Sequence, residues 1–348
     1  MSNRTVPELS RDSLPITGLP DLQSHLAAIE VDPATPFNAK LFDDIELQLT
    51  EANIPPLLPV LLPPLTSILK ATTQDPSPVL SLTIKLLSPL PFPRLLTIAD
   101  PPSILTALQS PLPGANLLGL AILHKAAATP ADAALLSTLE DVFLSMLTIW
   151  LVAPDTGVAE KAGKVLGDLL TVDCKIAPVS AQVNGTEPTR APRSAGTGSL
   201  WNLFLDMSSL IRDVCGDAAR PIRELSLSQG RVLRLLPRLA TLDIHALTHH
   251  SAEDVFPQGG LLQWAALQMV DRDDVLMRLN LVDFFEELVS VMRVAENRTP
   301  ETDADLKMVV QGAVGDGDDV RDALRGLPDR TVEEEAEPLR AFVMDLLS

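Results

Sequence analysis

Hydrophobic positions recur with helical spacing along almost the whole chain. In the segment NAKLFDDIELQLTEAN, at 38–53, the side chains of Leu41, Phe42, Ile45 and Leu49 fall on one helical face, and the acidic residues fall on the other. Nowhere do apolar and polar residues alternate with the period of two that a half-buried strand shows. The pattern therefore predicts an all-α fold.

Prolines and short polar turns divide this pattern into separate helices, and proline often stands where a first helical turn is expected. The capping-box sequence that begins at Thr331 predicts the start of the last helix. The predicted helices are 38–53, 57–70, 79–87, 94–99, 102–109, 115–127, 130–152, 155–170, 200–215, 221–243, 260–270, 274–295, 301–314, 320–327 and 331–347.

Helix pairs that recur at a period of about 40 residues are typical of HEAT and armadillo repeats. The segment TGVAEKAGKVLGDLL, at 156–170, is the best single example, with an apolar stripe and small residues between its members. We therefore predict an armadillo/HEAT-like α-solenoid of stacked helix pairs with one long flexible insertion. An irregular helical bundle is the alternative.

The composition changes sharply at 175–199, which is rich in Pro, Ala, Ser, Thr and Gly and has no apolar period. We interpret it as a disordered insertion, with a domain linker as the alternative, because helical pattern resumes at once in LWNLFLDMSSLIRDVCG. The predicted organisation is a flexible N-terminus at 1–19, helical repeats at 20–174, the insertion, and further helical repeats at 200–348.

The most apolar stretch, PPLLPVLLPPLTSILK at 55–70, is shorter than the roughly 20 residues of a spanning helix and holds five prolines. We interpret it as soluble core, with the prolines starting short helices. The first residues are polar and do not resemble a secretory signal. Two cysteines in 348 residues indicate a reducing compartment. The expected location is the cytoplasm, or the cytoplasm and the nucleus.

The net charge of −19 disfavours direct contact with nucleic acid and with anionic membranes, because both are polyanions. A basic protein partner is compatible with it.

No motif for a nucleotide loop, a metalloprotease helix or a nucleophile elbow is present, so we expect neither an enzyme nor a cofactor. His245 and His249 have the i, i+4 spacing of two metal ligands on one helix. We favour a solvated helix end there, because no further His or Cys lies near in sequence, and we therefore expect no metal site. Cys215 is interpreted as a packing residue and Cys174 as a helix-end residue.

One predicted helix, in the segment at 273–293, separates apolar and polar positions clearly. Its predicted core face is Leu276, Leu279, Val282, Phe285, Leu288, Val289 and Met292. Its polar stripe, together with a basic run on the preceding long helix, predicts a partner-binding surface: Asp283, Glu286, Glu287, Arg293, Arg231, Arg234 and Arg238. A solvated outer face, or pairing of these charges with one another, explains the same pattern. The three tryptophans, Trp150, Trp201 and Trp264, are expected to be buried.

The segments SLWNLFLDMSSLIRDVCG, SQGRVLRLLPRLATLDIHAL and GGLLQWAALQMVDRDDVLMRLNLVDFFEELVSVMR resemble fungal members of a chaperone family. It is the proteasome base-assembly chaperone family of the 26S non-ATPase regulatory subunit 5 type, whose fungal members are often labelled DNA mismatch repair protein. The resemblance covers about residues 38–295 and rests on general pattern.

The resemblance implies a monomeric armadillo/HEAT solenoid that binds the C-terminal domain of one proteasomal ATPase subunit. Such a protein acts as a non-enzymatic assembly chaperone for the regulatory-particle base, without contacting nucleic acid or membrane. The alternative function is a generic scaffold or transport adaptor that binds protein partners.

Overall fold

The computed structural model describes residues 16–175, 195–250, 255–256, 259–315 and 318–348. Within these ranges the regular structure is helical and no strand occurs, which confirms the predicted all-α class. Most of the two segments predicted to be flexible, at 1–19 and 175–199, lies outside the described residues.

The chain divides into two compact units, Met1–Lys125 and Ala126–Ser348. The boundary therefore falls before the segment at 175–199, and the helices on both sides of that segment belong to the second unit.

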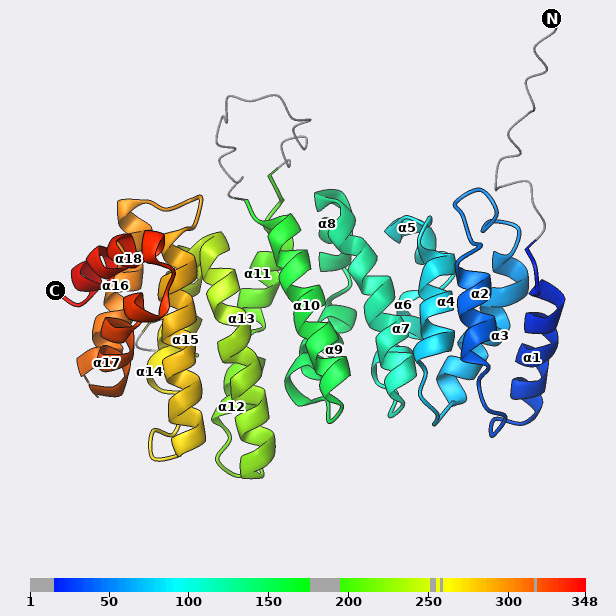
Figure 1. The fold of residues 1–348 in the computed structure, drawn as a ribbon, viewed down its shortest axis with the longest axis horizontal. Helices are drawn as coiled ribbons and strands as arrows, with labels where there is room; N and C mark the ends of the chain where they lie inside the picture. The colour runs from blue at the N-terminus through cyan, green and yellow to red at the C-terminus, as the bar shows by residue number, and fades with distance from the viewer. Residues whose placement is uncertain (1–15, 176–194, 251–254, 257–258, 316–317) are drawn as a thin grey trace, which may run out of the picture. The chain divides into compact units, whose positions relative to one another are not determined.

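In the first unit, helices that are near one another in sequence pack against one another, as the blue to cyan part of Figure 1 shows. Helix α3 contacts α1, α4 and α7, and the short α5 and α6 both pack on α7. The helices are α1 (Leu19–Val31), α2 (Ala39–Glu46), α3 (Leu58–Ala71), α4 (Ser77–Leu87), α5 (Phe92–Leu95), α6 (Pro101–Leu108) and α7 (Pro113–His124).

In the second unit, α9, α10, α13 and α15 lie side by side in that order (Figure 1). Its helices are α8 (Pro130–Ser137), α9 (Glu140–Val152), α10 (Thr156–Asp173), α11 (Ser199–Asp206), α12 (Ser208–Gly216), α13 (Ile222–His249), α14 (Leu261–Leu267), α15 (Val275–Arg293), α16 (Pro300–Gly315), α17 (Asp318–Gly326) and α18 (Glu333–Leu346). The short turns η2 (Lys125–Ala128) and η3 (Pro328–Arg330) are 3₁₀ helices.

Proline in the first turn is a recurring feature, as predicted, and it occurs in α1 and in α3 to α8. The interpretation of 55–70 needs one correction, because Pro63 and Pro64 lie inside α3 rather than at a helix start. Their missing N–H groups leave the carbonyls of Pro59 and Val60 without a helical donor. Pro59 and Val60 are both exposed, so water can donate hydrogen bonds to these carbonyls and the helix continues.

Some predicted helices are shorter or broken in the structure. The predicted helix at 130–152 is two helices, α8 and α9, bent by 95° at their junction. There the hydroxyls of Ser137 and Thr138 donate to the carbonyls of Ala134 and Leu135 at the end of α8, and each helix buries its own apolar side chains. Similarly, the predicted helix at 200–215 breaks at Met207, and that at 38–53 ends at Glu46.

The predicted capping box is also wrong. Helix α18 begins at Glu333, and its N-cap residue Val332 makes no side-chain capping bond. The Thr331 hydroxyl instead donates to the carbonyl of Leu327, in the preceding turn.

Among the described residues, no single helix has the length and apolar character needed to cross a membrane; the bent pair α8 and α9 meets those criteria only when its two helices are taken together.

The apolar face of α15 is centred differently from the prediction. Its buried residues are Met277, Leu281, Phe284, Phe285, Leu288, Val289 and Met292, whereas Leu276 and Leu279 are 62% and 56% exposed. The centre of the buried face, which packs on α13, is formed by the adjacent pairs Phe284–Phe285 and Leu288–Val289. Toward the N-terminal end of the helix, the same face includes Leu281 and Met277. Leu276 and Leu279 therefore lie on its flank.

Candidate functional site

The three arginines of the predicted basic run lie on one face of α13, because they are spaced i, i+3 and i+7. Arg231 is partly buried. Its guanidinium donates to the carbonyls of Leu151 and Ala153, each at 2.7 Å, at the C-terminal end of α9. These carbonyls have no helical donor of their own, so Arg231 caps α9.

Arg238 crosses from α13 onto α10 and pairs with Asp168 at 2.8 Å. It also donates to the hydroxyl of Thr171 at 3.0 Å. Gly167 makes this contact possible, since a Cβ atom there would lie 2.5 Å from Nη1 of Arg238. Arg238 therefore holds α13 against α10.

Arg234, between the other two, is the exposed member. Its side chain is 74% exposed and lies 3.7 Å from Glu160, which is 71% exposed, a geometry that contributes little to stability. Burial, and then the neighbouring positive charges of Arg220 and Arg234, lower the pKa of Arg231.

These arginines line a groove of about 800 Å³ formed by α10, α13 and α15, which we call the α10–α13–α15 groove. Its floor is largely apolar and includes Trp150, Ala159 and Leu235. Ile222 and Leu276 stand on its edges with 75% and 62% of their surface exposed.

The charge of the groove is opposite to that of the chain. Five basic residues line it against two acidic ones, Glu160 and Asp274, although the net charge of the protein is −19. The basic residues are Lys164, Arg223, Arg231, Arg234 and Arg238. An apolar floor with a basic rim fits a segment that carries both apolar and acidic side chains.

The polar stripe of α15 lies apart from this groove, and two of its members are already paired. Glu286 pairs with Arg330 at 2.5 Å, and Arg293 pairs with Glu335 on α18. Asp283 and Glu287 are exposed. The seven predicted residues therefore form two groups, of which the arginine group borders the groove.

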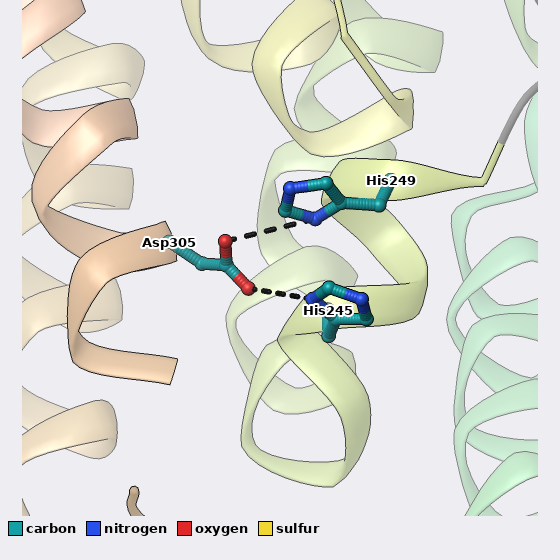
Figure 2. A group of neighbouring side chains, drawn as sticks. All are labelled: His245, His249 and Asp305. Atoms are coloured by element: carbon teal, nitrogen blue, oxygen red, sulfur yellow. Dashed lines mark hydrogen bonds and ion pairs between the residues drawn. The ribbon is translucent and has the colours of Figure 1, made fainter. Parts of the chain in front are cut away.

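The histidine pair of the sequence has a third neighbour that sequence spacing did not reveal. Figure 2 shows the rings of His245 and His249, on α13, facing the carboxylate of Asp305 on α16. Asp305 is buried, whereas both imidazoles are exposed. The two segments are about 60 residues apart in sequence, so only the fold brings them together.

The remaining singled-out residues are structural. Trp150, Trp201 and Trp264 are buried, as predicted. Both cysteines are buried thiols, and burial raises the pKa of the Cys215 thiol to about 12, which makes it a poor nucleophile.

In comparisons with known proteins, no protein-family model and no curated protein matches this chain.

Proposed function

We propose that this protein binds a partner protein through the α10–α13–α15 groove and that it has no enzymatic activity of its own. The observation that carries the proposal is an apolar groove with a basic rim on a strongly acidic chain. Exposed Ile222 and Leu276 supply apolar area that a partner would remove from water, and Arg234 supplies charge that is only loosely paired.

The partner that we propose is the C-terminal domain of a proteasomal ATPase subunit. Support comes from the resemblance of the segments that build α11 to α15 to base-assembly chaperones. In this role the protein would hold one ATPase subunit during assembly and block premature docking, which requires only reversible binding to one surface.

We further propose that the helices within each unit are armadillo- or HEAT-like repeats. The side-by-side packing of α9, α10, α13 and α15, in the order in which they occur along the chain, supports this proposal.

A peptide-binding transport adaptor is the competing function. Such adaptors present regular tryptophan ladders on their inner helices, whereas all three tryptophans of this chain are buried. This observation favours the assembly chaperone.

The proposal is tested by titrating the full-length protein against each purified ATPase C-terminal domain and measuring fluorescence anisotropy. We expect one domain to bind. Arg234→Glu and Leu276→Asp should each weaken that binding about tenfold or more, because one reverses a rim charge and the other places a carboxylate on the apolar edge.

Matched controls are Arg325→Glu on α17 and Leu47→Asp in the first unit, since both replace exposed residues outside the groove. If no ATPase domain binds, the proposed partner is wrong. If a domain binds and all four variants bind it equally, the groove is not the site.

A further inference from the structure

A break in α13 sets up a cluster of possible metal ligands. Asp243 has non-helical backbone angles, φ −158° and ψ 83°, and its carboxylate accepts a hydrogen bond from the N–H of Ala246 at 2.9 Å. Asp243 thus caps a short final helical segment. His245 and His249 lie on one face of that segment, with stacked rings whose centroids are 4.2 Å apart.

Asp305 of α16 completes the cluster (Figure 2). Its Oδ2 lies 3.2 Å from Nδ1 of His245, and its Oδ1 lies 3.6 Å from Nδ1 of His249. One ligand atom from each of the three residues lies within 4.8 Å of the other two.

These distances suit a tetrahedral zinc ion. Ligand atoms about 2.0–2.1 Å from Zn²⁺ are separated by about 3.3 Å in a tetrahedron, which is close to the 3.2 Å between Oδ2 of Asp305 and Nδ1 of His245. Nδ1 of His249 lies 3.6 Å from the other oxygen of the same carboxylate. Two imidazoles and one carboxylate are also a ligand set that Zn²⁺ uses when a fourth position stays open to solvent.

The burial of the carboxylate supplies an independent reason for a cation. The side chain of Asp305 is only 8% exposed, and its described ion-pair partners are the two imidazoles, which carry charge only when protonated. A buried carboxylate is costly without a positive partner. The imidazoles are 65% and 45% exposed, so an ion can reach the site from solvent.

We propose that His245, His249 and Asp305 bind a zinc ion and thereby fasten the final segment of α13 to α16. The hydroxyl of Thr248 now lies 2.8 Å from Nδ1 of His249, and zinc would replace that contact. The hydroxyl would keep its contacts with the carbonyls of Ile244 at 2.9 Å and His245 at 3.1 Å. This site is separate from the α10–α13–α15 groove and does not depend on the proposed function.

The test uses the full-length protein and Co²⁺, which takes zinc sites and absorbs visible light when tetrahedral. We expect one equivalent of Co²⁺ to give such a spectrum and Zn²⁺ to displace it. His245→Gln and His249→Gln should each weaken Zn²⁺ binding at least tenfold in calorimetric titrations, because each removes one of three protein ligands.

His250→Gln is the matched control, since His250 adjoins the cluster in sequence but pairs with Asp206 instead. At about 100 times Kd, Zn²⁺ should raise the Tm of the second unit by roughly 5–10 °C. Asp305→Asn should also abolish binding, but its buried position makes misfolding a competing explanation, so the two exposed histidines decide the result. Absence of Co²⁺ binding, or binding that the two histidine variants leave unchanged, would overturn the proposal.

Discussion

Replacing Asp173 by alanine should destabilise the second unit strongly. Asp173 is the last residue of α10 and is fully buried. Its Oδ1 accepts hydrogen bonds from the N–H and hydroxyl of Thr197 and from the N–H of Gly198, at 2.8–3.1 Å. Its Oδ2 accepts from the N–H of Leu200 at 2.7 Å and of Trp201 at 3.4 Å. One carboxylate therefore caps α11 and joins it to α10.

The expected cost follows from these contacts. Loss of an N-terminal cap costs about 1 kcal/mol. Each buried N–H group left without an acceptor adds about 1–3 kcal/mol, and the N–H groups of Gly198 and Leu200 are both buried contacts of Asp173. Asp173→Ala should therefore cost about 3–7 kcal/mol. Asp173→Asn should cost roughly 2 kcal/mol, since it keeps one carbonyl acceptor but turns an NH₂ group toward donors.

Urea unfolding followed by tryptophan fluorescence measures this effect cleanly. All three tryptophans lie in the second unit, so the signal reports that unit alone. With a typical m value of about 2–3 kcal/mol/M, a loss of 4 kcal/mol lowers the unfolding midpoint by roughly 1.5 M.

Asp322→Ala is the matched control, because Asp322 is exposed in the middle of α17. It should shift the free energy of unfolding by no more than about 0.5 kcal/mol. A midpoint for Asp173→Ala that equals that of Asp322→Ala would refute the capping argument.

Two further predictions concern other buried polar groups. Asn116→Ala should destabilise the first unit by about 1–3 kcal/mol, because the buried Nδ2 of Asn116 donates to the carbonyls of Ala107, Leu108 and Ser110. Unfolding followed by circular dichroism should then show an earlier transition, and an unchanged transition would contradict this prediction. At pH 8, below its raised pKa of about 12, Cys215 should stay a neutral thiol in the native chain. It should therefore react with iodoacetamide about 1000-fold more slowly in the native chain than in urea. Mass spectrometry measures both rates, and equal rates would count against burial as the cause.

Much of the helical framework could be predicted from local sequence. Helices such as α4 and α10 have their start signals, a Ser-Pro dipeptide and the capping Asp155, next to an apolar stripe. Local signals of this kind do not reveal where a long apolar run bends. The break between α8 and α9 depends on where each helix finds a buried surface, and that surface is built by other parts of the chain.

The residues of the candidate sites were predicted less completely, since their contacts depend on neighbours distant in sequence. The three arginines looked equivalent on α13, but α9 and α10 give Arg231 and Arg238 structural contacts and leave only Arg234 exposed. Asp305 had no sequence signal that linked it to His245. Leu276 is exposed because the buried face of α15 is rotated about the helix axis relative to the predicted face. Apolar periodicity alone did not define the direction of that face closely enough to predict this.

The kink at Asp243 makes the two proposals separable. Before the kink, α13 directs Arg234 toward α10 and the groove. After it, the short final segment directs His245 and His249 toward α16. Because the residues of one site make no described contact with those of the other, Arg234→Glu should change partner binding without changing zinc affinity, and His249→Gln should do the reverse. A variant that impaired both would indicate that the kink transmits changes along α13, and the two sites would then have to be treated as one coupled element.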